Sequence, residues 1–132
     1  MLADQNQLYC KPMKSTLSFY KYHGAGNDFI ILDAADLKGQ SLSPKRVAEW
    51  CKRRYGVGAD GLMVFTAVNN EEIDFEMQYY NADGSSGMMC GNGGRCIALY
   101  AYEVKGVSKT MRFALKTAIF QAEILDSNSV AL

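Results

Sequence analysis

The run Cys90-Gly-Asn-Gly-Gly94 restricts the fold of this chain more than any other feature of its sequence. It stands directly before residues 95–105, whose apolar positions recur at helical spacing and which Gly106 ends. Glycine is a poor residue with which to begin a core helix unless the backbone must approach another group closely. The sequence therefore predicts a largely buried helix with a cysteine at its N-terminus.

The setting of Cys90 favours a reactive thiolate beside an anion-binding site. The first N–H groups of a helix have no partner within the helix, and the helix dipole adds positive potential there. A thiol in that position forms thiolate nearer neutral pH, and the same N–H groups can hold a carboxylate. These residues indicate chemistry at the carbon atom next to a carboxylate. The competing interpretation is a small buried cysteine, the role that we expect for Cys96 inside the helix.

Length and charge narrow the class of protein. The chain has 132 residues, enough for one domain, and 14 Lys and Arg balance 14 Asp and Glu. This balance gives no reason to expect binding to nucleic acid or to a membrane surface. No apolar run approaches the roughly 20 residues that span a bilayer, and the N-terminus lacks the features of a signal peptide. A soluble, cytoplasmic protein is therefore expected.

The cysteines and the single histidine argue against a metal site. In a cytosol Cys10, Cys51, Cys90 and Cys96 are expected to be reduced. The sequence has no CxxC pair, and His23 is its only histidine. A zinc site is therefore not expected, and a Cys-His hydrolase is disfavoured.

The order of elements follows from periodicity and turn residues. Residues 1–15 are polar and aperiodic, and we expect a flexible N-terminal segment there. Ser43 and Pro44 predict the start of a helix that ends before Gly56. Aromatic, β-branched and alternating apolar residues predict strands at residues 17–22, 29–32, 62–68, 73–80, 110–116 and 118–125.

Two asparagines stand where glycine-bearing turns meet strands. Asn27 and Asn81 have the ordinary explanation that asparagine favours turns. The functional alternative is an amide that donates to a carboxylate and accepts from an ammonium group. Residues 56–61 are rich in glycine but lack the Lys-Ser/Thr ending of a P-loop, so a nucleotide site is not expected. Asp28 and Asp60 are expected to form turns or caps.

Four motifs together resemble the diaminopimelate epimerase family. They are His23-Gly-Ala-Gly-Asn-Asp-Phe29, Gly56-Val-Gly-Ala-Asp-Gly-Leu62, Asn81-Ala-Asp-Gly-Ser85 and Met89-Cys-Gly-Asn-Gly-Gly-Arg-Cys96. The resemblance covers about residues 17–125 and the N-terminal half of family members. It implies an α+β fold in which residues 16–132 form one lobe, a mainly antiparallel sheet wrapped around a central helix.

The resemblance also implies a reaction and a set of residues. The family interconverts LL- and meso-diaminopimelate, for lysine and peptidoglycan precursors, without pyridoxal phosphate, metal or any other cofactor. Two cysteines face opposite sides of the substrate α-carbon, and Cys90 matches the first of them. Asn27 and Asn81 match substrate-contacting asparagines, while Gly91 and Asn92 match the backbone that holds the α-carboxylate.

The chain departs from the family in what it lacks. Family members are about twice as long, and their second lobe carries the other cysteine in a motif absent from these residues. Position 61 is glycine where some members have glutamine. The expected partners are thus an amino-acid substrate and a C-terminal lobe with the second cysteine. A homodimer with a second copy of the chain is left open. The isolated chain is expected to be inactive.

Other functions stay open at this point. A related two-cysteine racemase or epimerase, for example of the proline type, would share the first-lobe motifs. A non-catalytic binding domain could keep the lobe fold without turnover. A redox switch that uses Cys90 and Cys96 is a third possibility.

Overall fold

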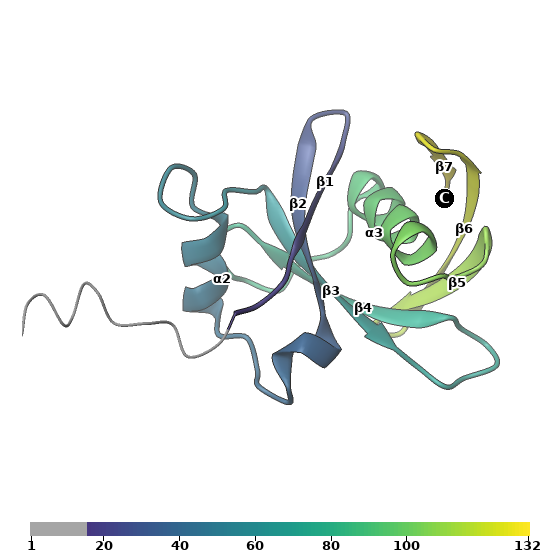
Figure 1. Cartoon of the computed structure of the whole chain (residues 1–132), viewed down its shortest axis with the longest axis horizontal. Helices are drawn as coiled ribbons and strands as arrows, with labels where there is room; N and C mark the ends of the chain where they lie inside the picture. The colour runs from purple at the N-terminus through teal and green to yellow at the C-terminus, as the bar shows by residue number, and fades with distance from the viewer. Residues whose placement is uncertain (1–15) are drawn as a thin grey trace, which may run out of the picture.

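The strands of the described residues form a single, curled sheet of seven strands (Figure 1). The computed structural model describes residues 16–132, so the flexible segment predicted at residues 1–15, with Cys10, lies outside the described residues. The strands pair in chain order, with parallel pairing at β2–β3 and β4–β5 and antiparallel pairing elsewhere. They are β1 (Tyr20–Gly24), β2 (Asn27–Asp33), β3 (Gly61–Ala67), β4 (Phe75–Asn81), β5 (Thr110–Leu115), β6 (Ala118–Asp126) and β7 (Ser129–Ala131).

Helix α3 (Gly91–Glu103) lies in the curve of this sheet (Figure 1). It contacts β1, β2 and β3 and also β6 and β7, near the other end of the strand order. Ile97, Ala98 and Ala101 are fully buried between the helix and the sheet, and Tyr100 is 1% exposed. The prediction of a mainly antiparallel sheet wrapped around a central helix is confirmed.

Helix α2 (Pro44–Cys51) packs on the other face of the sheet, at β2 and β3. Phe29 and Ile31 of β2 face the core around α3, whereas Ile30 and Leu32 pack with Val47 of α2. A strand that is covered on both faces needs apolar residues at every position, which explains the unbroken run Phe29–Leu32. A strand with one exposed face alternates instead, as β4 does.

The N-terminus of α3 differs from the prediction, because the helix begins at Gly91 and not near Arg95. Glycine disfavours a helix start by propensity alone, but here tertiary packing decides. A Cβ atom at Gly94 would lie 2.8 Å from Met89 Cε and 2.9 Å from Leu132 Cδ2. At position 94 the first turn of α3 can pack this closely only without a side chain.

Two short elements were not predicted: the 3-10 helix η1 (Ala34–Leu37) and strand β7. Asp33 caps η1 through the N–H of Ala35 at 3.0 Å. Strand β1 also begins later than expected, at Tyr20, and β4 begins at Phe75. Elements of three or four residues are too short to show a periodicity from which to predict them.

Gly84 packs the loop before α3 against the start of α2, so its substitution should lower the free energy of unfolding. Its φ angle is +88°, and an added Cβ atom would lie 2.0 Å from the Pro44 carbonyl oxygen. Gly39 is the matched control, because its φ is +78° and nothing lies within 4 Å of the added atom. We expect Gly39→Ala to lower the free energy of unfolding by about 1 kcal/mol and Gly84→Ala by at least about 2 kcal/mol more. Urea unfolding measures both, and equal losses would contradict this packing.

Candidate functional site

Three strand ends and one helix end form the candidate site. Asn27 begins β2, Gly61 begins β3 and Asn81 ends β4. Register places these ends together, because Phe29 pairs with Gly61 and Gly61 pairs with Asn81. The turn before β2 is Ala25-Gly26, with φ angles of 53° and 85°, as a two-residue hairpin turn requires. The N-terminus of α3 reaches this end of the sheet through Cys90 and Asn92.

Cys90 is the N-cap of α3, and its side chain is exposed. Its sulfur accepts a hydrogen bond from the N–H of Gly93 at 3.4 Å. The thiol also lies 3.5 Å from Asn27 Oδ1, to which it donates. This is the position that the sequence predicted for a thiol at a helix N-terminus.

The backbone beside Cys90 offers unused donors. The N–H of Gly93 donates to the Cys90 sulfur, and the N–H of Gly94 donates to the Cys90 carbonyl oxygen. Within residues 16–132, the N–H groups of Gly91 and Asn92 have no hydrogen-bond acceptor. Two N–H groups at a helix N-terminus can hold a carboxylate or another anion.

The side chain of Asn92 lies beside that of Asn27. Asn92 Nδ2 donates to Asn27 Oδ1 at 3.4 Å, and Arg95 Nη2 donates to Asn92 Oδ1. Gly24 of β1 lies next to Asn92, because a Cβ atom there would be in van der Waals contact with Asn92 Cβ and Oδ1, at 3.4 Å. The structure therefore brings Asn27, Cys90 and Asn92 together.

Asn81 lies at the same end of the sheet but has different partners. Its Nδ2 donates to Ser85 Oγ at 3.1 Å, and its N–H donates to the Ser85 carbonyl at 2.8 Å. Asp83 accepts from both the N–H and the hydroxyl of Ser85, and these bonds lower the pKa of Asp83. Within the described chain Asn81 makes no hydrogen bond to Asn27, Cys90 or Asn92, so its present role is to hold this loop.

Tyr79 lies beneath these residues. A Cβ atom at Gly87 would approach both Tyr79 and Asn81 at 2.8–2.9 Å, and one at Gly93 would lie 3.5 Å from Tyr79 Cε2. One at Gly61 would lie 2.9 Å from the Tyr79 hydroxyl and from the Tyr80 carbonyl oxygen. The place of a side chain at position 61 is thus occupied by Tyr79. Burial, and then the nearby charges of Cys90 and Asp60, raise the Tyr79 pKa.

An ion cluster next to Asn27 was not predicted as part of the site. Arg53 donates to Asp28 with both terminal nitrogens, at 2.6 and 3.1 Å, and also to Asp60 at 3.2 Å. Lys21 donates to Asp28 at 2.7 Å. Asp60 in turn accepts from Asn27 Nδ2 at 2.7 Å and from the Asp28 N–H at 3.1 Å. Asp28 lies within β2, and it and Asp60 each accept the backbone N–H of the other, so neither caps a turn as expected. Both connect to the candidate site instead.

The other described cysteines are placed for packing. Cys51 and Cys96 are buried, 3% and 4% exposed. Burial raises the pKa of the Cys51 thiol and raises that of Cys96 to about 11. Residues 16–132 bring together no group of three His, Cys, Asp or Glu side chains that could hold a metal ion. No helix in this range combines the length and the apolar character needed to cross a bilayer.

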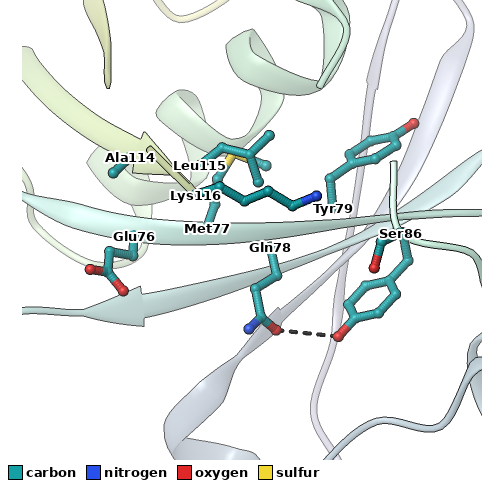
Figure 2. A pocket seen from close by; sticks show the side chains of 9 residues that line it. Glu76, Met77, Gln78, Tyr79, Ser86, Ala114, Leu115 and Lys116 are labelled. Atoms are coloured by element: carbon teal, nitrogen blue, oxygen red, sulfur yellow. Dashed lines mark hydrogen bonds between the residues drawn. The ribbon is translucent and has the colours of Figure 1, made fainter. Parts of the chain in front are cut away.

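A cavity of about 290 Å³ lies apart from this group, where β4 and β5 separate after the Met77–Leu115 pair. Figure 2 shows Glu76 and Gln78 on one side of β4, with Tyr79 and Lys116 on the other. Gln78 accepts a hydrogen bond from the Tyr80 hydroxyl at 3.3 Å. None of Asn27, Cys90 and Asn92 lines this cavity.

The sequence pattern of one family, described as diaminopimelate epimerase, matches residues 19–131. The chain belongs to the diaminopimelate epimerase family. Diaminopimelate epimerase of Thermosynechococcus vestitus is 42% identical over 104 residues, which are 77% of this chain and 36% of that protein. The Aquifex aeolicus protein of the same name is 37% identical over 118 residues, 84% of this chain and 42% of its own length. The chain therefore spans between a third and a half of these curated relatives.

Solved structures agree with the diaminopimelate epimerase fold. Methylitaconate-delta-isomerase superposes with a TM-score of 0.64 at 14% identity, over 85% of this chain and 61% of that chain. A putative phenazine biosynthesis PhzC/PhzF protein from Clostridium difficile gives 0.55 at 17% identity, over 77% and 39% respectively. At this level of identity the likeness concerns the fold alone.

The ion cluster predicts how stability depends on pH. Hydrogen bonds from Arg53, and then from Lys21, hold the pKa of Asp28 below its ordinary value of 3.8, although burial opposes them. Asp28 therefore contributes fully to the free energy of unfolding at pH values above its ordinary pKa. This contribution is lost as the pH falls through the lower pKa of the folded state. We expect Asp28→Asn to lower the free energy of unfolding by about 1–2 kcal/mol at pH 7, a modest effect because Arg53 is largely exposed.

The same substitution should also weaken the loss of stability in acid. Urea unfolding from pH 7 down to about pH 2 measures both effects. Asp36→Asn is the control, because Asp36 is exposed, and we expect it to change stability by less than about 0.5 kcal/mol. If the free energy of unfolding of Asp28→Asn fell as steeply with decreasing pH as that of the unmodified chain, the ion pairs of Asp28 would not be the cause of the acid sensitivity.

Proposed function

We propose that this chain supplies one lobe of an epimerase that interconverts LL- and meso-diaminopimelate without a cofactor. The observation that carries the proposal is the exposed Cys90 thiol at the N-terminus of α3, beside the unused N–H groups of Gly91 and Asn92. Membership of the family and the relatives that bear its name support the choice of substrate.

The proposed reaction explains why these groups are adjacent. The substrate α-carboxylate would accept from the N–H groups of Gly91 and Asn92, which stabilise the charge that develops when the α-carbon loses its proton. Cys90 as thiolate would take that proton, or as thiol would return one to the same face. Asn27 would contact the substrate from β2, and Asn81 would do so from the end of β4. A positioned acid or base of this kind contributes about 10²–10⁴-fold to a rate.

Inversion of a stereocentre needs a proton donor on the opposite face as well. Cys51 and Cys96 are buried and serve the core, so neither suits this role. We therefore assign the second cysteine to a C-terminal lobe outside these residues, in keeping with the part of its relatives that the chain spans.

The isolated chain should be inactive, whereas a two-lobe version should be active. We would join residues 16–132 to the second half of a family relative and incubate both proteins with LL-diaminopimelate in deuterated water. The two-lobe protein should incorporate deuterium at the α-carbon, and the 132-residue chain should not. Catalytic exchange by the chain alone would contradict the assignment of the second cysteine. Exchange on proline but not on diaminopimelate would contradict the substrate.

Cys90 and Cys96 should behave differently on substitution. In the two-lobe protein, Cys90→Ala should lower the exchange rate by at least about 100-fold, because it removes the acid–base group. Cys96→Ala should leave exchange within a few-fold and lower the free energy of unfolding by about 1 kcal/mol through lost packing. Near-normal epimerisation by Cys90→Ala would refute the site.

The thiols can also be compared without turnover. In the 132-residue chain, mass spectrometry of the cysteine peptides should show alkylation of Cys90 well before that of Cys51 or Cys96. The reason is that Cys90 is exposed, whereas burial shields the other two thiols and raises their pKa. Equal reactivity of these three cysteines would contradict this difference.

A further inference from the structure

A continuous chain of polar side chains crosses the candidate site from one arginine to another. Arg53 donates to Asp60, and Asp60 accepts from Asn27 Nδ2 at 2.7 Å. Asn27 Oδ1 accepts from Asn92 Nδ2 at 3.4 Å, and Asn92 Oδ1 accepts from Arg95. The members come from β2, α3 and the loop before β3, so the chain exists only in the folded protein.

The chemistry of the two ends fixes the direction of each amide between them. A guanidinium group can only donate hydrogen bonds, and an ionised carboxylate can only accept them. Arg95 therefore requires the oxygen of Asn92 to face it, which turns Asn92 Nδ2 toward Asn27. Asp60 requires the nitrogen of Asn27 to face it, which leaves Asn27 Oδ1 for Asn92 and for the Cys90 thiol at 3.5 Å.

We propose that Asp60 is a positioning residue, which fixes the side-chain amide of Asn27 so that its oxygen, and not its nitrogen, faces Cys90. The inference rests on the proposed function in one respect: the orientation of Asn27 matters for catalysis only if Cys90 transfers protons. The orientation itself can be tested without substrate.

The orientation matters because the two ends of an amide act on a thiol in opposite ways. An oxygen acceptor stabilises the protonated thiol, whereas an N–H donor would stabilise the thiolate. With Asp60 in place, Cys90 can hold a proton that it is ready to return to a substrate. Without Asp60 the Asn27 amide loses its strongest anchor, and its oxygen holds the thiol less firmly.

Other charged and titratable groups surround Asn27 and Cys90, and they stay unchanged in the cycle on Asp60 and Asn27. They come from β1, β2, the loop before β3, β4 and α3, and they are Lys21, Asp28, Arg53, Tyr79, Arg95 and Cys96. Asp60→Asn removes a negative charge and replaces a group that can only accept by an amide that can also donate, so that the direction of the Asn27 amide is no longer fixed. Both changes favour the thiolate. A double-mutant cycle separates the two, because only the second change acts through Asn27.

The cycle uses the 132-residue chain and the pH at which Cys90 alkylation reaches half its maximal rate. Asp60→Asn should lower this midpoint more in the presence of Asn27 than in the Asn27→Ala background, by about half a pH unit or more. Equal shifts in the two backgrounds would mean that Asp60 acts through its charge alone, and would overturn the proposal. If Cys90 is no more reactive than Cys96 in any variant, the proposed function fails instead.

Asp28→Asn provides the matched control. It removes the same charge from the same cluster, but Asp28 accepts no hydrogen bond from the Asn27 side chain. The shifts that Asp28→Asn and Asn27→Ala cause in the pH midpoint of Cys90 alkylation should be additive. A departure from additivity as large as that for Asp60 would also overturn the proposal.

A measurement on the unmodified chain covers the case in which a variant does not fold. The NMR signals of the Asn27 side-chain N–H group should move more when a carboxylate titrates than when the Cys90 thiol ionises, because the nitrogen donates to Asp60 and only the oxygen faces the thiol. The shift that follows the carboxylate should persist after Cys90 has been alkylated. A side-chain N–H signal that moves mainly with the ionisation of Cys90 would place the nitrogen beside the thiol and contradict the assigned role of Asp60.

Discussion

The packing of α3 inside the curled sheet is the constraint on which the rest of the structure depends. The helix contacts β1, β2 and β3 as well as β6 and β7, and at Gly94 its first turn has no room for a side chain. At Gly94 a single added carbon would meet Met89 and Leu132. The same packing brings the N-terminus of α3 to the end of the sheet where β2 and β3 begin. The position of Cys90 is thus a consequence of how the core is filled.

Electrostatics near Cys90 follows from the arrangement of the neighbouring ion cluster. Lys21 and Arg53 carry two positive charges, and Asp28 and Asp60 carry two negative charges, so the cluster is neutral as a whole. A neutral cluster can orient Asn27 without placing a net negative charge against a thiolate or a substrate carboxylate. The positive potential at the site then comes from the N-terminus of α3, where aligned peptide dipoles favour anions, and from the Arg95 guanidinium beside it.

Sequence patterns predicted the elements with strong periodicity and failed where tertiary contacts decide. The alternation within residues 73–80 gave β4, and Ser43-Pro44 gave the start of α2. The start of α3 at Gly91 was missed because propensity argues against it. The contact between Asn27 and Asp60 spans 33 positions and depends on the parallel register of β2 and β3, which no local pattern contains. The motifs did identify Cys90, Asn27 and Asn92, which the fold brings together, but their chemical roles stay predictions.

The site is open on one side, and this openness agrees with the proposal of a second lobe. Cys90 presents its thiol to solvent, and Met88, two residues before it, is 86% exposed. Tyr55 is 84% exposed, in the segment between Arg53 and Asp60. Large apolar side chains on loops beside a site are suited to an interface. Closure by a second lobe would bury them and exclude water, and in the resulting low dielectric the N–H groups of Gly91 and Asn92 would bind a carboxylate most strongly.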